Sequence, residues 1–434
     1  MNPSYTDSGG LSFSTNEILF WTRVICLLLY DKYCQNTDNQ SLWNMRRANS
    51  VANLVFIVNG TLDEATTFGG DRHTLGLANY CAEQGDNVRI IAPAATQRHY
   101  GLSATDIKWF LTDNARLPTV FHPRHIPMTL LRYSSRIARG ALAAISRCEV
   151  FYSGNILPHD ALCGLILKKR GICQKFVCRC DQILHLEPYR QRLHFTLHRW
   201  ASRVGMTIVL KSADKLIAVN SLIASQWQQA KQRRPSALDI TTLSYGLDPV
   251  LLSGSTHHKE YDLAFFGRLD YVKGADILPE VLQRICQSRP ACRMLVIGDG
   301  PLAAKLFVRS EALGLRKNIV WTGQIGSQER FNQLAKANVL VYPTREDAYP
   351  MAVAETLALG IPVVAACNPH LRCVYGDALL YAEEDSTEDF AKHVVSLLDS
   401  KTFRKEQIGR GIAFAKSMPP AGNYEAFREV LLSR

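Results

Sequence analysis

The sequence predicts an α/β protein built from two doubly wound parallel sheets in tandem. Short apolar segments rich in β-branched residues alternate with segments of helical periodicity along most of the chain, and this alternation is typical of parallel sheets covered by helices. The alternation stops in a polar stretch at residues 252–261 and then resumes. The length of 434 residues also leaves room for two domains of ordinary size.

The first block of alternating segments opens with an expected strand at residues 51–59. A loop with Gly69 and Gly70 follows, then a helical pattern that ends at Gly85 and a second strand at residues 88–92, which is the order of a βαβ unit. These segments, with further strands expected at residues 149–153, 175–179, 215–220 and 240–243, assign residues 51–255 to an N-terminal domain.

We assign no structure to the extension at residues 1–50. Its apolar run at residues 18–30 is interrupted by Arg23, and the run is shorter than the roughly 18 residues that a membrane-spanning helix needs. A packing helix and a helix on a membrane surface both fit this pattern.

The second block, residues 256–434, contains expected strands at residues 262–266, 293–297, 319–322, 339–342 and 362–365. A final helical pattern at residues 424–432 is expected to cross back to the N-terminal domain. Because ligands of such sheets bind outside the carboxyl ends of the strands, the site is expected in a cleft between the domains.

The net charge of +11 is concentrated in one region of the chain. Residues 160–235 contain 14 Lys and Arg against 4 Asp and Glu, and an apolar helical face runs through them at Leu193, Leu197, Trp200 and Val204. Two interpretations fit: this face rests on an anionic membrane surface, or it packs on the sheet while the charges are solvated. Nucleic acid is not expected as a partner, because no recognition motif accompanies the charge.

The 12 cysteines are scattered, and only Cys173, Cys178 and Cys180 form a tight group. No second group stands at the spacing of a structural zinc site. No signal peptide is visible at the start of the sequence. We therefore expect reduced thiols, no metal site, and a cytoplasmic protein.

Two fixed cations follow the expected strand at residues 262–266. Gly267 and Arg268 come directly after it, and Lys273 follows five residues later. An arginine fork and a lysine point charge in one loop suit a diphosphate. The alternative is a solvated loop with two surface charges.

Two carboxylates follow the expected strand at residues 339–342. Asp347 is predicted at the junction between a loop and a helix, and Glu355 about two turns along that helix. A helix start offers free N–H groups to an anion, and Glu355 would accept hydrogen bonds from a ribose diol. The alternative is an ordinary N-cap aspartate followed by an ordinary helix glutamate.

Residues 266–365 resemble the C-terminal domain of the retaining GT-B glycosyltransferases of the family 4, or group 1, type. The resemblance rests on five segments in matching order and separation: FFGRLDYVKG, VIGDGP, IVWTGQI, DAYPMAVAE and ALGIPVVA. FGGDRHTLGLA, SADKLIAVNSLIASQW and SYGLD extend it more weakly over the N-terminal half, so that it covers about residues 52–434.

The resemblance implies a GT-B fold and a role for each matching residue. Arg268 and Lys273 would stabilise the leaving nucleotide diphosphate, Asp347 would face the donor sugar, and Glu355 would bind the ribose. The remaining donor-site residues that it implies are Gly69 and Gly70, which let a loop approach the diphosphate, Gly267, the backbone of Ala348, Tyr349, Pro350 and Met351, and Gly323, Gln324 and Ile325 near the base.

This sequence departs from the family in both domains. Asp347 stands where relatives have glutamate, and Ala348 where many have glycine. Relatives often place a histidine in the N-terminal domain where these loops contain Asn155 and Asp181, and the nearby His159 is out of register. These three residues are the candidates on the acceptor side.

The function that the resemblance implies is a hexosyltransferase that moves a sugar, with retention, from a nucleotide diphosphate sugar to an acceptor hydroxyl. A saccharide or lipid-linked acceptor in polysaccharide or glycolipid biosynthesis is expected, at the inner face of the membrane. No Asp-x-Asp follows a strand, so transfer is predicted without metal or cofactor beyond the co-substrate. A sugar-nucleotide epimerase of the same fold and a non-catalytic binding relative are the alternatives.

Overall fold

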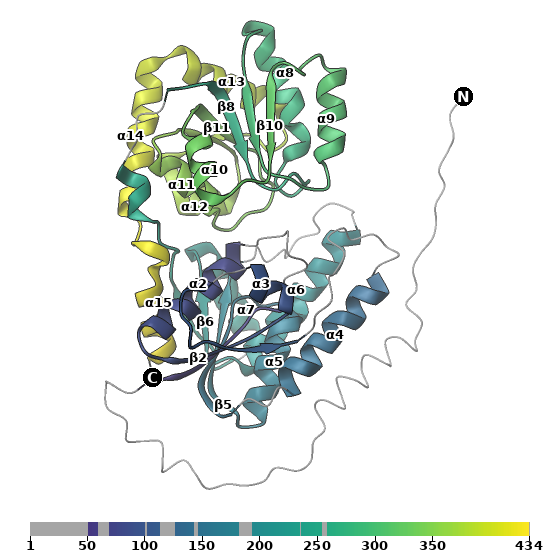
Figure 1. Cartoon of the computed structure of the whole chain (residues 1–434), viewed down its shortest axis with the longest axis vertical. Helices are drawn as coiled ribbons and strands as arrows, with labels where there is room; N and C mark the ends of the chain where they lie inside the picture. Colours follow the sequence, from purple (N-terminus) through teal and green to yellow (C-terminus); the bar gives the residue numbers. More distant parts are fainter. Residues whose placement is uncertain are drawn as a thin grey trace, which may run out of the picture.

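The computed structural model describes residues 51–59, 69–99, 102–112, 126–142, 146–181, 193–234, 236–253 and 258–433. Within these ranges the chain forms two Rossmann-like domains, one above the other in Figure 1, each a parallel sheet with helices around it. The predicted fold class is therefore confirmed. The expectations for residues 1–50 lie outside the described residues.

The N-terminal sheet has seven parallel strands in the order β3-β2-β1-β4-β5-β6-β7. The order reverses between β1 and β4, and their carboxyl ends border the crevice that such a switch point creates. The strands are β1 (Asn53–Ile57), β2 (Asn87–Ala92), β3 (Lys108–Leu111), β4 (Cys148–Ser153), β5 (Cys173–Cys180), β6 (Lys215–Ala218) and β7 (Asp239–Thr242).

Six helices surround this sheet in the described residues: α2 (Gly69–Glu83), α3 (Ala94–His99), α4 (Ile126–Leu142), α5 (Pro158–Lys169), α6 (Leu193–Ser212) and α7 (Ser221–Arg233). The strand expected to reach residue 220 ends at Ala218 instead. Its predicted last residue, Asn220, is the N-cap of α7 and accepts a hydrogen bond from Ile223 N at 2.9 Å. The pairing of β6 with β5 and with β7 ends at Ala218, and Asn220, although its backbone is extended, already belongs to the start of α7.

The C-terminal sheet has six parallel strands in the order β10-β9-β8-β11-β12-β13. They are β8 (Tyr261–Phe266), β9 (Met294–Ile297), β10 (Ile319–Gly323), β11 (Ala337–Tyr342), β12 (Val363–Ala366) and β13 (Leu380–Ala382). The helices are η2 (Pro249–Ser253), η3 (Ala275–Ile277), α8 (Leu278–Ser288), α9 (Ala303–Ala312), α10 (Ser327–Leu334), α11 (Met351–Ala358), α12 (Pro369–Tyr375), η4 (Gly376–Ala378), α13 (Thr387–Asp399) and α14 (Lys401–Ser417).

The chain passes between the domains twice, and the two crossings contact each other. Leu247 N donates to Pro419 O at 2.8 Å, and Leu247 also forms a bridge with Pro420. At Gly246 an added Cβ would lie 2.5 Å from Pro420 O, so only glycine permits this close approach. The two segments form a compact double connection rather than two separate linkers.

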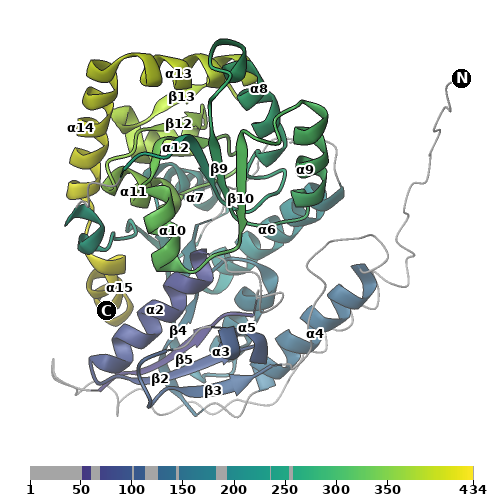
Figure 2. The same cartoon turned by 45° about the horizontal axis from the view of Figure 1, so that its top comes forward.

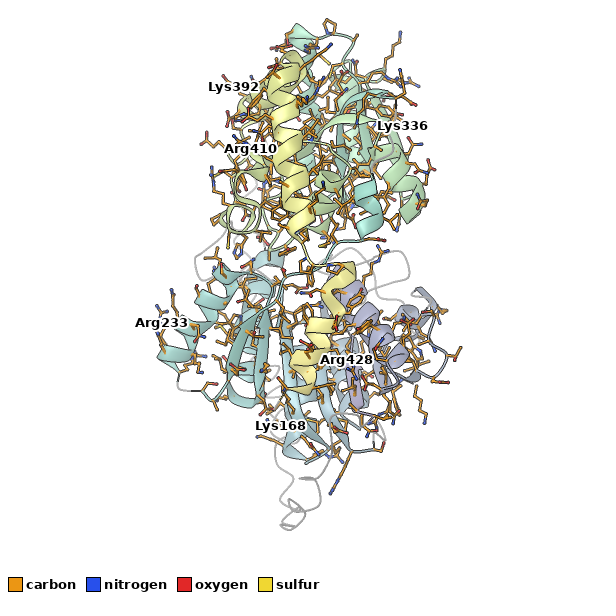
Figure 3. All side chains as sticks on the ribbon, turned by 90° about the vertical axis from the view of Figure 1, so that its left-hand side faces the viewer. Lys168, Arg233, Lys336, Lys392, Arg410 and Arg428 are labelled. Carbon is orange, nitrogen blue, oxygen red and sulfur yellow. The ribbon has the colours of Figure 1, made fainter. Side chains whose placement is uncertain are left out.

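After the second crossing come η5 (Ala421–Asn423) and the last helix, α15 (Tyr424–Leu432), which lies on the N-terminal domain against α2. Arg428 Nε pairs with Asp86 at 2.7 Å, and Figure 3 shows Arg428 on this helix below α14. Lys175 Nζ donates to Val430 O and Leu431 O, both at 3.0 Å. A lysine at the carbonyl end of a helix is favoured by the helix dipole.

None of the described helices is both long and apolar enough to cross a bilayer.

Candidate active site

The carboxyl ends of two neighbouring strands bring Lys273 and Asp347 together. β8 and β11 pair in the sheet, and the loops that follow them carry these residues. Lys273 Nζ forms an ion pair with Asp347 Oδ2, and the Tyr342 hydroxyl donates to the same oxygen at 2.8 Å. The carboxylate therefore has a fixed position at the edge of the sheet.

Asp270 organises the loop after β8. It pairs with Arg268 Nε through one oxygen and accepts from the backbone N–H of Lys273 at 2.8 Å through the other. The Arg268 side chain remains 41% exposed, so its guanidinium is accessible to a ligand. At Gly274, which has a φ of 68°, an added Cβ would lie 1.9 Å from Pro343 O. The loops after β8 and β11 are thus packed directly on each other.

Arg345 ties these loops together, and sequence reasoning did not single it out. Its Nη1 donates to Tyr271 O and to Asp276 Oδ1, both at 2.6 Å, and Nη2 lies 2.5 Å from Asp385. The guanidinium carbon lies 3.9 Å from the centroid of the Tyr271 ring. An arginine in a loop carries no sequence signal for this role, because its partners come from two segments far from it in sequence, residues 271–276 and Asp385.

The prediction that Asp347 stands at the start of a helix is wrong. α11 begins at Met351 with Pro350 as its N-cap residue, and Asp347 precedes it in an irregular loop. The physical reason is Pro350, because a proline disfavours helical backbone in the residue before it. Glu355 is therefore one turn from the start of α11, not two turns beyond Asp347.

The loop between Asp347 and α11 also touches the N-terminal domain. Ala348 and Tyr349 are buried in the hydrophobic cluster of that domain, and Ala348 O accepts from Asn220 Nδ2 at 2.8 Å. The Tyr349 ring meets the Tyr245 ring edge-on, with centroids 5.4 Å apart. Of the predicted donor residues, these two thus also join the domains.

Glu355 lies beside Arg330 of α10. Arg330 Nη2 is 3.3 Å from Glu355 Oε2. Burial raises the pKa of Glu355, while Arg330 and Arg72 act in the opposite direction. Arg72 belongs to α2, so charges of both domains act on this carboxylate, and Figure 2 shows α10 and α11 on the side that faces α2.

The three residues predicted near the base lie at the end of β10 and directly after it. Gly323 ends that strand with a φ of 66°, a value that favours glycine, and Gln324 and Ile325 lead into α10. The first turns of α10 carry Arg330, so this segment and Glu355 are connected through one side chain.

Gly69 and Gly70 are the first two residues of α2 rather than part of a loop. An added Cβ at Gly70 would lie 2.5 Å from Asp181 Oδ2 and 3.0 Å from Arg179 Nη2, whereas no atom lies within 4 Å at Gly69. Gly70 is thus required by the packing of α2 against the end of β5, and Gly69 adjoins open space.

Asp181 lies in a buried polar network around Arg179, which sequence reasoning also missed. Tyr245 OH donates to Asp181 Oδ2 at 2.9 Å, and Arg179 Nη2 lies 3.2 Å from the same oxygen. Arg179 Nη1 meets His73 Nδ1 at 2.8 Å, and His73 Nε2 meets Gly422 O at 2.9 Å. A carbonyl only accepts, so Nε2 carries the proton and Nδ1 accepts from Arg179. This tautomer agrees with the direction of the His73 pKa, which burial lowers.

Asn155 and His159 have contacts within their own domain. Asn155 Nδ2 donates to Asp160 Oδ2 at 2.6 Å, and its Oδ1 accepts from Leu157 N at 2.8 Å at the start of α5. His159 is buried and stacks on Tyr133 with centroids 5.0 Å apart. These contacts favour structural roles for both residues.

The cysteines of β5 are buried thiols, and burial raises the pKa of Cys173 to about 12. Over the residues that the structure describes, no three His, Cys, Asp or Glu side chains gather as a metal site would require.

Two facing Rossmann-like domains with a charged site between them define a GT-B protein, and solved structures share this fold. Anabaena HepE in complex with UDP and glucose has a TM-score of 0.66 at 16% identity, covering 88% of this chain and 100% of its own. WaaG, a glycosyltransferase involved in lipopolysaccharide biosynthesis, has a TM-score of 0.66 at 15% identity with the same coverages.

Residues 260–400 match the profile of the family described as Glycosyl transferases group 1. A phosphatidyl-myo-inositol mannosyltransferase of Propionibacterium freudenreichii is 25% identical over 69% of this chain and 73% of the relative. The D-rhamnosyltransferase WbpZ of Pseudomonas aeruginosa is 28% identical over 42% of this chain. That match spans only about half the length of the rhamnosyltransferase, 47%.

Proposed function

We propose that this protein is a retaining hexosyltransferase that moves a sugar from a nucleotide diphosphate sugar to an acceptor hydroxyl. The observation that carries the proposal is the cluster of Arg268, Lys273 and Asp347 at the carboxyl ends of β8 and β11. Matches to glycosyltransferases across both domains support it.

The chemistry assigned to this cluster is stabilisation of the leaving group. As the bond between the sugar C1 and the diphosphate oxygen breaks, negative charge grows on the diphosphate, and Arg268 and Lys273 are held where preorganised cations stabilise it. The acceptor oxygen then bonds to C1 on the same face and its proton passes to the leaving phosphate oxygen. No protein nucleophile is required.

Asp347 is proposed to orient the donor sugar. It is one methylene shorter than glutamate, and the Tyr342 hydroxyl and Lys273 Nζ hold one of its oxygens. Its other oxygen is proposed to accept from a sugar hydroxyl.

Transfer is proposed to need no metal, because Arg268 and Lys273 supply charge that a divalent ion would otherwise bring. Turnover should persist in excess chelator. Complete loss of turnover in chelator with recovery in magnesium would refute this part of the proposal.

A lipid-linked or saccharide acceptor and a peripheral position on the inner face of the membrane are proposed from two observations. Relatives include a phosphatidyl-myo-inositol mannosyltransferase and an alpha-monoglucosyldiacylglycerol synthase. On α6, the Trp200 side chain is 63% exposed among Arg199 and Arg203, as expected of a helix on anionic lipid. The side chains of Leu193 and Leu197 lie outside the described residues.

Liposome flotation tests the membrane proposal. The protein should float with vesicles containing phosphatidylglycerol and not with phosphatidylcholine alone, and Trp200→Ala should weaken flotation. Equal flotation with both vesicles would contradict it.

The donor site is tested by thermal unfolding with UDP, GDP, ADP and CMP and their sugar conjugates, with Glu355→Ala beside wild type. A ligand at a hundred times its dissociation constant adds about 2.7 kcal/mol. One nucleotide series should stabilise wild type and not Glu355→Ala. Stabilisation of neither protein by any nucleotide would reject the donor site.

Turnover assays distinguish a glycosyltransferase, a sugar-nucleotide epimerase and a non-catalytic binding protein. Lys273→Met should lower kcat by about a hundredfold or more if the ammonium stabilises the leaving group, while Lys305→Met on the exposed face of α9 should not. Interconversion of the free sugar nucleotide without acceptor would indicate an epimerase instead. Binding without turnover would indicate a non-catalytic relative.

A further inference from the structure

Arg330 is a largely buried cation in the C-terminal domain that the catalytic scheme above does not use. It lies on α10 directly after the segment assigned to the base, and its side chain is 13% exposed. Among the residues that the structure describes, its ionic partner is Glu355, at 3.3 Å, whose side chain is 19% exposed. A buried ion pair costs desolvation of both groups, so it is weak evidence for a purely stabilising role.

Two aromatic rings hold the Arg330 guanidinium. Its carbon lies 4.7 Å from the centroid of Phe266 and 4.5 Å from that of Phe331. Phe266 is the last residue of β8, directly before Gly267 and Arg268. One of the two rings that flank Arg330 therefore directly precedes the loop that is assigned to the diphosphate.

The guanidinium of Arg330 is incompletely paired among the described residues. Its Nε is buried without a hydrogen-bond partner there. A buried donor without a partner is unfavourable because it has lost its hydrogen bonds to water, and a ligand oxygen at this point would satisfy it. The orphan donor lies beside the carboxylate assigned to the ribose.

We propose that Arg330 is a nucleoside-binding residue that completes the ribose site. Its Nη2 orients Glu355 to accept from a ribose hydroxyl, and its Nε–H donates to a nucleoside oxygen. Glutamate and arginine together thus offer one acceptor and one donor to the nucleoside. This inference rests on the proposed donor site and adds to it a residue that recognises the ribose of the nucleotide.

The charges around Glu355 support this arrangement. Burial raises the pKa of Glu355, and Arg330 of α10 and Arg72 of α2 counteract the rise. Tyr375 of α12 also interacts with Glu355, which contributes to the raised pKa of that tyrosine. Without Arg330 the pKa of Glu355 rises further, so part of the carboxylate is protonated at lower pH and its hydrogen bond to the ribose weakens there.

The experiment compares wild type, Arg330→Met and Arg330→Lys, with Arg309→Met as control. Arg309 pairs with Glu280 at 2.6 Å on exposed surface of the same domain. Binding is measured by calorimetry for the stabilising nucleoside diphosphate, its 2′-deoxy and 3′-deoxy analogues, and inorganic pyrophosphate, each at pH 6 and pH 8.

Arg330→Met should weaken binding of the nucleoside diphosphate about tenfold or more, the effect of losing a hydrogen bond to a charged group. Pyrophosphate binding should be unchanged, and the preference for ribose over at least one deoxyribose should be lost. The affinity of this variant for the nucleotide, relative to wild type, should rise from pH 6 to pH 8. Arg330→Lys, which keeps the charge without Nε, should recover the pH profile but not the ribose preference.

Retention of the ribose preference in both Arg330 variants would overturn the inference. An equal loss of pyrophosphate and nucleotide binding would also overturn it, because it would place Arg330 at the diphosphate or in folding alone. If wild type binds pyrophosphate but no nucleoside diphosphate, the ribose site fails, and if wild type binds neither ligand, the whole proposed donor site fails. Should Arg330→Met not fold, Arg330→Lys alone decides the ribose preference.

Discussion

Single residues in this protein hold the site through contacts that are distant in sequence. Lys273 and Asp347 are 74 positions apart, and Arg179 and His73 are 106 apart. Lys273 and Asp347 lie in the loops that follow two neighbouring strands, whereas Arg179 lies at the end of β5 and His73 on α2. The effect of a substitution therefore depends on which strand ends meet, not on the local segment.

Gly70→Ala should lower the free energy of unfolding by about 1–3 kcal/mol, the usual cost of overpacking. Its Cβ would lie 2.5 Å from Asp181 Oδ2. Gly69→Ala is the matched control, since its Cβ meets no atom within 4 Å. Urea denaturation measures both. An equal effect of the two substitutions would show that the packing at Gly70 does not determine the loss of stability.

Asp160 should make stability depend on pH. Burial raises its pKa to about 8 in the folded chain, although Asn59 N and Asn155 donate to it. The unfolded value is about 3.9, so between these values the folded state binds the extra proton. The free energy of unfolding should therefore fall as pH rises from about 4 to 8 through this group.

Asp160→Asn removes this titration, so the free energy of unfolding should fall less steeply as the pH rises. Urea denaturation at pH 5, 6, 7 and 8 measures it, with Asp299→Asn on the exposed loop after β9 as the control. The same slope in Asp160→Asn and wild type would contradict the assignment.

At the scale of elements, the end of β5, the start of α2 and the second crossing between domains are joined by one chain of hydrogen bonds. Arg179 donates to Gly70 O at 2.7 Å and to His73, and His73 donates to Gly422 O at 2.9 Å. His73 also packs against Phe427 of α15 with ring centroids 4.5 Å apart. The last helix is thus anchored by a neutral histidine as well as by the ion pair of Arg428.

His73→Phe keeps the aromatic packing but removes both hydrogen bonds. It should lower the free energy of unfolding by about 1–3 kcal/mol, because Arg179 loses a buried partner. His393→Phe, on the partly exposed face of α13 beside Asp389, is the control. Thermal and urea unfolding measure both. A neutral result for His73→Phe would mean that water replaces the imidazole at no cost.

At the scale of the whole molecule, a hydrogen bond joins the loop at Ala348 to the opposite domain, beside the ring contact of Tyr349 with Tyr245. Asn220 caps α7 and also donates to Ala348 O at 2.8 Å. Asn220 comes from the N-terminal domain, and Ala348 follows Asp347 in the C-terminal domain. The Asn220 amide therefore contributes to the coupling between the approach of the domains and the position of this loop.

Asn220→Ser separates the two roles of this residue. Serine still accepts from Ile223 N, but its shorter side chain does not reach Ala348 O, so kcat/KM should fall severalfold with little loss of stability. Asn220→Ala should show the same fall and also lose about 1 kcal/mol of stability with the cap. Steady-state kinetics and urea denaturation distinguish them. Unchanged kcat/KM in both variants would exclude the coupling.

Two strands escaped prediction, β3 and β13. β3 has two exposed ends and two half-buried central residues, and it lacks the continuous apolar run by which the buried central strands were recognised. β13 has only three residues and lies in the short apolar run ALLYA, residues 378–382, which was not predicted as a strand. The start of α11 was misplaced for a different reason, because the restriction imposed by Pro350 was outweighed by the apolar periodicity that follows it.

The sequence by itself determined the fold class, the positions of the central strands, and the residue types at the proposed donor site. Buried parallel strands need apolar runs, and a diphosphate site needs fixed cations after a strand, so both features can be recognised in short segments of the sequence. Only the tertiary structure decided which side chains meet. The contacts in question join separate elements: Arg345 with Asp276, Arg179 with His73, Arg330 with Glu355, and Asn220 with Ala348. Such contacts depend on strand order and loop geometry, and no spacing along the chain encodes them.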